Sequence, residues 1–202
     1  MNDAAAVLRG WPAPTPEQQR LRDAFMHHLA QHRDGTARSC YPDHITASTL
    51  ILSADHTRVL LTLHAKAKAW FQMGGHCEPG DATLDAAALR EAVEESGMPG
   101  LVLDPVPVQL SAHEVPFCDP RGGVRHLDVR FLAVAPDTAR AVVSDESDDV
   151  AWWPVDALPN RDPDMVELVD LALRRARPDR AGHNGTRLPV QREAVVDPVS
   201  GR

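Results

Sequence analysis

The chain has 202 residues, a length that suits one domain with extensions, and 43% of these residues are hydrophobic, which is enough to build a core. The formal net charge of −8 argues against a nucleic-acid polymer as a partner, because the phosphate backbone attracts basic surfaces. Aromatic residues make up 4% of the chain, which also disfavours a platform for stacked bases.

The three cysteines are far apart in the sequence and odd in number, which fits a reducing compartment without a disulfide framework. They are Cys40, Cys77 and Cys118. The N-terminus is polar, and no apolar run approaches the roughly 18 residues that a membrane span needs. We therefore expect a cytoplasmic protein without a membrane partner.

Residues 1–42 are expected to form an N-terminal helical extension. Pro16 after Thr15 is typical of a helix start, and apolar residues then recur at helical spacing over residues 21–29. Because the apolar stripe is narrow, we expect this helix to pack on the main domain or on a second subunit of a homodimer. We expect its histidines to be solvated rather than bound to metal. They are His27, His28 and His32.

The main domain is expected over residues 43–177. Apolar and β-branched runs predict strands at 44–52, 58–63, 101–103, 106–115, 125–135 and 150–154. Asp162 and Pro163 are typical of the start of a final helix. Residues 178–202 show no periodicity, so we expect a mobile C-terminal tail.

The predicted strand 125–135 alternates in character. Apolar side chains occupy one face, and the other face begins with polar ones. The polar residues are His126, Asp128 and Arg130. Two interpretations are open at this point: the polar face lines a cleft, or it faces solvent at a sheet edge.

Between the second and third of these predicted strands lies a glycine-rich loop followed by a helix, over residues 74–98. Thr83 is suited to begin this helix and Gly97 to end it. Helical spacing places three carboxylates on one face, and like charges so arranged destabilise a helix. They are Glu91, Glu94 and Glu95. The pattern indicates a site for a hard divalent cation, Mg²⁺ or Mn²⁺. A solvated acidic face is the alternative, but it would not require the preceding glycine loop.

These residues resemble the Nudix box, whose family pattern is G-x5-E-x7-R-E-U-x-E-E-x-G-U, with U a bulky aliphatic residue. Arg90 and the three glutamates match their positions, as do Gly97 and, as the last aliphatic residue, Met98. Two departures occur: Asp81 stands where the family has glutamate, and eight residues instead of seven separate it from Arg90. We expect the extra residue in the loop or first helical turn, between Asp81 and Ala86.

The resemblance implies an α/β fold, a Nudix-type α/β/α sandwich with a mixed sheet, beside the N-terminal helical extension. It also implies that Glu94, Glu95 and the Gly74 carbonyl bind metal, while Glu91 is a further ligand or the catalytic base. Arg90 is expected to orient a box carboxylate, or to form a helix ion pair with Glu94.

A further carboxylate often comes from an acidic loop before a tryptophan strand in this family, and Glu146 is our choice for it. Four side chains are expected to contact substrate: Lys68, His76, His126 and Arg130. Either histidine could instead help to bind metal or be structural, and Lys68 could be an ordinary surface lysine. For Cys77 we expect a structural role rather than that of a nucleophile.

The implied activity is hydrolysis of a diphosphate linkage in a nucleoside diphosphate derivative or related small molecule, by water attack at phosphorus. A Nudix-fold module that binds a nucleotide without cleaving it is the alternative, although such modules usually lose a box carboxylate. An isopentenyl-diphosphate isomerase-like enzyme is a further alternative, but its cysteine motif is not found in this sequence.

Overall fold

The computed structural model describes residues 3–142 and 147–177. Seven strands form one sheet: β1 (Asp43–Leu52), β2 (Arg58–His64), β3 (Trp70–Phe71), β4 (Met73–His76), β5 (Val102–Glu114), β6 (Arg125–Val134) and β7 (Ser147–Pro154). The helices are α1 (Ala4–Gly10), α2 (Pro16–Gln31), α3 (Leu84–Ser96) and α4 (Pro163–Ala176). These elements confirm the predicted α/β class with N-terminal helices.

The sheet is mixed, and its strand order is β3-β2-β1-β6-β5. β1 and β6 run parallel without a register shift, so that Asp43 pairs with Arg125 and Leu52 with Val134. The other pairs are antiparallel, with β4 added beside β1 and β7 beside β2. The central strand β1 therefore has β4 next to one half of its length and β2 next to its end.

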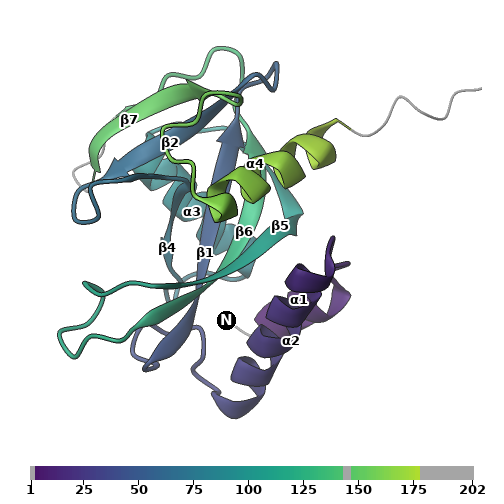
Figure 1. Cartoon of the computed structure of the whole chain (residues 1–202), viewed down its shortest axis with the longest axis vertical. Helices are drawn as coiled ribbons and strands as arrows, with labels where there is room; N and C mark the ends of the chain where they lie inside the picture. Colours follow the sequence, from purple (N-terminus) through teal and green to yellow (C-terminus); the bar gives the residue numbers. More distant parts are fainter. Residues whose placement is uncertain (1–2, 143–146, 178–202) are drawn as a thin grey trace, which may run out of the picture.

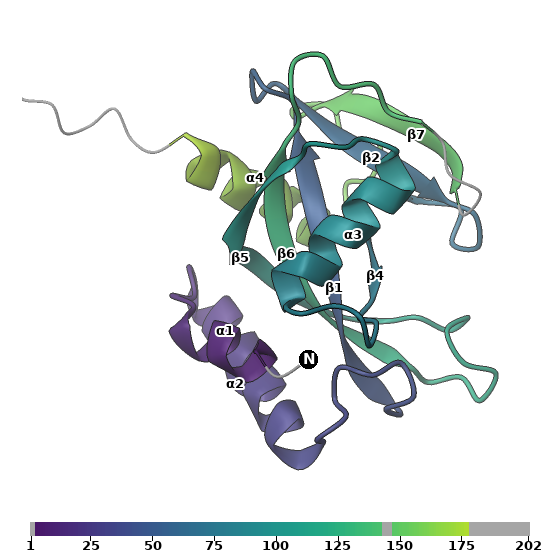
Figure 2. The same ribbon diagram turned by 180° about the vertical axis from the view of Figure 1, so that it is seen from behind.

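Helices cover both faces of the sheet, as Figures 1 and 2 show from opposite sides. On one face α3 packs on β1, where the Thr49 hydroxyl donates to the Ala88 carbonyl at 3.0 Å. On the other face α4 packs through Leu168 and Ala172 against a cluster that includes Leu50 of β1. The α/β/α arrangement is thus fixed by alternation along β1, whose successive side chains point to opposite helices.

The N-terminal helices pack on the main domain. Trp11 donates its indole N–H to the Pro107 carbonyl at 2.5 Å, and the Gln18 side-chain amide bonds both backbone groups of Leu110. In addition, the Asp3 carboxylate accepts a hydrogen bond from the backbone N–H of Leu84 at 3.1 Å, at the start of α3. Of the two placements predicted for this extension, the structure shows the one on the main domain.

Three local predictions need correction. Segments 101–103 and 106–115 form a single strand, β5, whose pairing with β6 is irregular between Asp104 and Gln109, where prolines without an N–H interrupt the ladder. The predicted strand 150–154 begins earlier, at Ser147. His28 is buried rather than solvated, and its Nε2 atom lies 3.2 Å from the Gly35 carbonyl oxygen. The predicted tail 178–202 lies outside the described residues.

Candidate active site

The glycine pair allows close packing between β4, β1 and α3. A Cβ atom at residue 74 would lie 2.2 Å from the Ser48 Cβ atom, inside the neighbouring strand. A Cβ atom at residue 75 would lie 2.8 Å from the Glu91 carboxylate. Gly74 therefore requires glycine for steric reasons, because the clash is with the neighbouring strand, whereas at Gly75 the close atoms are the carboxylate of Glu91, which the backbone directly faces.

Helix α3 is an uninterrupted α-helix. Its first turn is capped by the Thr83 hydroxyl, which accepts from the Ala86 N–H at 3.3 Å, and Gly97 ends it in the left-handed conformation with φ of 65°. Ala92, at a position where the family has a bulky aliphatic residue, is fully buried against the sheet. The extra residue therefore lies before the helix, as predicted, and the carboxylate face is intact.

The box carboxylates gather where α3 faces the glycine loop. The Glu95 Oε2 atom accepts from the Gly74 N–H at 3.2 Å, and the Glu91 carboxylate faces Gly75. Glu94 lies further out, with 58% of its side chain exposed. Two carboxylates thus converge on the loop, while the third is directed toward solvent.

Arg90 holds this arrangement together. Its Nε and Nη2 atoms donate to the two oxygens of Asp81 at 3.0 and 3.1 Å, which is a bidentate pair. Nη1 donates to Glu91 and Glu94 at 3.0 and 2.9 Å, and Nη2 also donates to the His76 carbonyl at 2.9 Å. Both roles predicted for Arg90 therefore occur together. The shorter acid, Asp81, thus reaches the guanidinium across the longer linker.

These contacts shift the pKa values of both Arg90 and Asp81. Hydrogen bonds from Arg90 to Asp81 raise the pKa of the Arg90 guanidinium above its ordinary value, more than burial lowers it. For Asp81, burial acts to raise the pKa, but the bonds from Arg90 and from the Glu78 N–H outweigh it and lower the pKa. Both groups are therefore charged at neutral pH.

Replacing Asp81 by Asn should lower the free energy of unfolding by about 1–3 kcal/mol at neutral pH, since a charged hydrogen-bond partner of Arg90 is lost. The folded-state pKa of Asp81 is lowered, so its stabilisation is present above its unfolded pKa and disappears as the pH falls through the folded pKa. The difference between wild type and Asp81→Asn should therefore shrink below about pH 4. Urea unfolding across pH measures it.

As a control, Glu17→Gln removes one partner of the exposed Arg20 pair and should have a much smaller effect. A difference for Asp81→Asn that stays constant from neutral to acidic pH would contradict the assigned ion pair.

The polar face of β6 is buried rather than open. Asp128 accepts from the hydroxyls of Thr46 and Ser48 at 3.0 and 2.7 Å, and from Arg130 Nε at 2.9 Å. Burial acts to raise the pKa of Asp128, but Arg130 and these hydrogen bonds lower it.

The other end of Arg130 is also occupied. It contacts Gln109 and Asp164, each at 2.7 Å, and the side chain is 5% exposed. This closed network favours a structural role for Arg130 over the predicted contact with substrate, and it matches neither of the two interpretations of this face.

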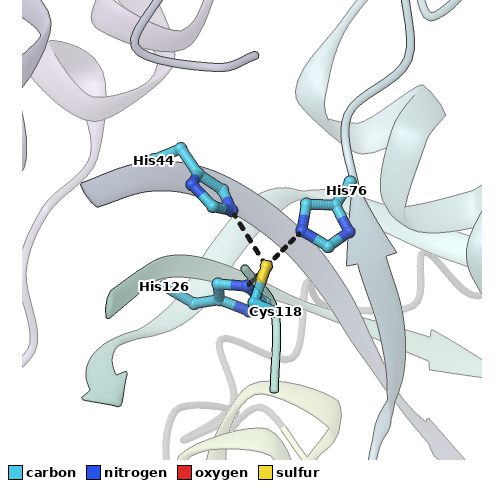
Figure 3. Close-up of side chains that lie close together, drawn as sticks. All are labelled: His44, His76, Cys118 and His126. Carbon is cyan, nitrogen blue, oxygen red and sulfur yellow. Dashed lines mark hydrogen bonds between the residues drawn. The ribbon is translucent and has the colours of Figure 1, made fainter. Parts of the chain in front are cut away.

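His76 and His126 lie in a second cluster, which the sequence did not predict as a whole. With them are His44, at the start of β1, and Cys118, from the loop between β5 and β6 (Figure 3). The four potential ligand atoms lie within 4.8 Å of one another. Burial lowers the pKa of His76 to about 4 and of His126 to about 3, so both imidazoles are neutral at pH 7. In the sequence, His44 and His126 each stand near the start of a predicted strand. Their pairing follows from this only when the register of the two strands is known.

Three further predicted residues have different outcomes. Lys68 lies at the turn between β2 and β3, where its ammonium pairs with Asp148 at 2.6 Å while the side chain stays 68% exposed. Cys77 is buried, and burial raises the pKa of its thiol to about 12, which favours the structural role. Glu146 lies outside the described residues.

The family model of the NUDIX domain matches residues 42–172. The chain therefore belongs to the Nudix family, and it is an enzyme of the Nudix hydrolase type. No curated protein matches the sequence. Within the described ranges, no helix has the length and apolar character needed to cross a membrane.

Several solved structures share the fold. A NUDIX-family hydrolase from Clostridium perfringens has 23% identity and a TM-score of 0.51, with 64% of this chain and 95% of that chain covered. The dihydroneopterin triphosphate pyrophosphohydrolase of E. coli has 19% identity and a TM-score of 0.53, covering 64% and 94%. The NUDIX domain of Shewanella oneidensis NrtR, complexed with ADP ribose, has 18% identity and a TM-score of 0.51, covering 74% and 97%.

Proposed function

We propose that this enzyme hydrolyses a diphosphate linkage in a nucleoside diphosphate derivative or a related small molecule, by water attack at phosphorus and with Mg²⁺ or Mn²⁺ as cofactor. The observation that carries the proposal is the convergence of Glu91 and Glu95 on the Gly74–Gly75 backbone. A cytoplasmic location and a homodimer remain predictions from the sequence.

The residues present fit a hard divalent cation. The candidate donors are all oxygens, from Glu91, Glu94, Glu95 and the Gly74 carbonyl, which is the set that Mg²⁺ prefers. The absence of a Cβ atom at Gly75 lets the Glu91 carboxylate lie against the backbone of the glycine loop. When bound, such an ion would neutralise diphosphate charge and lower the pKa of a coordinated water.

The protein's own residues supply the rest of the chemistry. Arg90 fixes the orientation of Glu91 and Glu94 through its two Nη1 hydrogen bonds. A carboxylate must then accept the proton of the attacking water, and Glu91 or Glu146 is suited to this by position or by resemblance. Lys68, exposed at the β2–β3 turn, is suited to bind a substrate phosphate if it exchanges its ion pair with Asp148.

A panel assay tests the proposal. Purified protein would be incubated with Mg²⁺ and nucleoside triphosphates, sugar nucleotides, dinucleotides or non-nucleotide diphosphates, and the phosphorylated products would be measured. Turnover of one class that depends on Mg²⁺ is the expected result. Saturable binding of a nucleotide without any product would instead establish the binding module. Isomerisation of a diphosphate ester without hydrolysis would establish the isomerase-like alternative.

Glu146→Gln is expected to reduce kcat strongly with little change in KM, the pattern of an interaction made mainly in the transition state. If Glu91 is bound to the ion its basicity falls, so a second carboxylate becomes the better base. Steady-state kinetics on the substrate found in the panel measures this effect. Asp149→Asn, at a described and exposed acidic position nearby in sequence, is the control. Wild-type kcat in Glu146→Gln would return the base role to Glu91.

A further inference from the structure

The cluster of His44, His76, Cys118 and His126 lies outside the carboxylate site, and its ligand types differ from those of a magnesium site. It contains three imidazoles and one thiol and no carboxylate. Nitrogen and sulfur ligands select zinc and other borderline or soft metals, whereas Mg²⁺ takes oxygen. We propose that these four residues bind a zinc ion in a closed, structural His₃Cys site.

The distances from the Cys118 sulfur to the imidazole nitrogens can be compared with those of tetrahedral zinc. With Zn–N bonds of about 2.0–2.1 Å and a Zn–S bond of about 2.3 Å, tetrahedral angles place each nitrogen about 3.5 Å from the sulfur. Cys118 Sγ lies 3.4 Å from Nε2 of both His76 and His126, and 4.0 Å from Nε2 of His44. The sulfur–nitrogen distances of His76 and His126 thus agree with tetrahedral zinc, the distance of His44 is about 0.5 Å longer than the tetrahedral value, and all four ligand atoms lie within 4.8 Å of one another.

The three imidazoles surround one point. Their ring centroids are 5.1 Å apart for His44 and His76, 4.9 Å for His44 and His126, and 5.0 Å for His76 and His126. Figure 3 shows all three rings directed at the Cys118 sulfur. Strand pairing brings the three rings together. His44 pairs with His126, and His76 pairs with Thr46, which lies two residues further along β1.

A second hydrogen bond fixes the tautomer of His44. Its Nδ1 atom lies 3.1 Å from the Cys40 carbonyl oxygen, which can only accept, so Nδ1 carries the proton and Nε2 offers a lone pair to the cluster. Metal-bound histidines commonly donate their other N–H to such a carbonyl. His44 is 1% exposed, so the lone pair is also shielded from water.

Hydrogen bonds within the cluster cannot satisfy all of its nitrogen and sulfur atoms. The Cys118 thiol has one proton, which can serve only one of the three imidazole nitrogens close to it. One zinc ion would engage all four ligands and displace the thiol proton to solvent, leaving a site with a net charge of about +1.

The proposed ion would join three strands and a loop beside the active site. Cys118 lies in the β5–β6 connection, His44 on β1, His126 on β6 and His76 at the end of β4. His76 directly follows Gly75, and its carbonyl accepts the Arg90 hydrogen bond. Zinc would thus hold in place the end of the glycine loop that faces Glu91, and this role replaces the substrate contact predicted for the two histidines.

Cobalt substitution tests the site directly. Protein without a histidine tag would be stripped with a chelator and titrated with Co²⁺. The proposal expects a thiolate-to-cobalt charge-transfer band in the near ultraviolet and intense visible bands of a tetrahedral ion. The carboxylate site offers oxygen ligands only and produces neither signal. Wild-type protein without these bands would overturn the proposal.

The matched pair of variants is Cys118→Ser and Cys40→Ser. Cys118→Ser should lose the charge-transfer band, whereas Cys40→Ser should keep it. Cys40 is also the thiol of the other group of potential ligands brought together in the described residues, with His32 and Asp34. A band that survives in Cys118→Ser, or is lost only in Cys40→Ser, would contradict the assignment.

Two more measurements do not depend on the folding of Cys118→Ser. Wild-type protein purified without chelator should contain about one zinc ion per chain by elemental analysis. Adding Zn²⁺ to stripped wild-type protein should raise Tm by roughly 5–10 °C, and Mg²⁺ should not reproduce this. No zinc after purification and no shift of Tm on addition of Zn²⁺ would show a cluster held by hydrogen bonds alone.

Glu95→Gln should keep the cobalt spectrum while losing hydrolysis, so a failure of the zinc proposal can be distinguished from a failure of the proposed hydrolase function.

Discussion

Glu95→Gln is expected to lower kcat by roughly two to four orders of magnitude, because several kcal/mol of charge stabilisation around a divalent ion would be lost. The amide keeps the shape and the helix propensity of the glutamate, and its oxygen can still accept from the Gly74 N–H. The fold should hold or gain slightly, since repulsion along α3 is relieved. Turnover as a function of Mg²⁺ concentration, with Tm measured in parallel, separates activity from stability.

Asp85→Asn is the matched control. It removes one negative charge from the first turn of the same helix, at a residue that is not among the predicted metal ligands. Its kcat should stay near that of the wild type. Glu94→Gln, at the more exposed carboxylate, tests the outermost of the predicted metal ligands. Unchanged turnover at saturating Mg²⁺ in both Glu94→Gln and Glu95→Gln would refute the metal assignment.

Arg130→Met is expected to cost about 3–5 kcal/mol of unfolding free energy at neutral pH, because it leaves a buried carboxylate without its cation. Asp128 is 3% exposed, and methionine fills the space without replacing the guanidinium bonds. The folded-state pKa of Asp128 is lowered, so the pair stabilises the protein above the unfolded pKa and loses that effect as the pH falls through the folded pKa. The gap to wild type should therefore narrow in acid.

Arg125→Met provides the comparison on the same strand. Its pair with Asp43 is half exposed on the arginine side, so the expected loss is only about 0–1 kcal/mol. The double variant Arg130→Met with Asp128→Leu should recover part of the stability lost in Arg130→Met, since no buried charge remains. Equal losses for Arg125→Met and Arg130→Met in denaturant unfolding would mean that the buried network contributes no more than a surface pair.

The sequence was sufficient for the box helix because its information is local. Caps, helical spacing and the three glutamates lie within one short segment, and the position of the extra residue before α3 follows from the same spacing. The Asp81–Arg90 pair needed the structure, because a shorter acid and a longer linker compensate only in a particular loop conformation.

Other features of the site could not be predicted from the sequence, because they depend on contacts between residues that are far apart along the chain. The polar face of β6 could not be identified as buried from its alternation, because Gln109 and Asp164, which close the network around Arg130, come from β5 and α4. His44 and Cys118 were not recognised as partners of His76 and His126 for a related reason. Their proximity depends on the register of β1 with β6 and on the β5–β6 connection, which brings Cys118 to His44 and His126.

The position of the N-terminal helices has a consequence for synthesis. Trp11 and its partner Pro107 are 96 positions apart, and Gln18 and Leu110 are 92 apart. At roughly 5–20 residues per second, the first helices leave the ribosome some 5–20 seconds before the strand that covers them. During that interval the side chains of Leu8, Trp11 and Phe25, all fully or almost fully buried in the finished protein, lack the part of their partner surface that β5 supplies. The nascent chain is therefore most vulnerable to aggregation and to chaperone capture before β5 emerges.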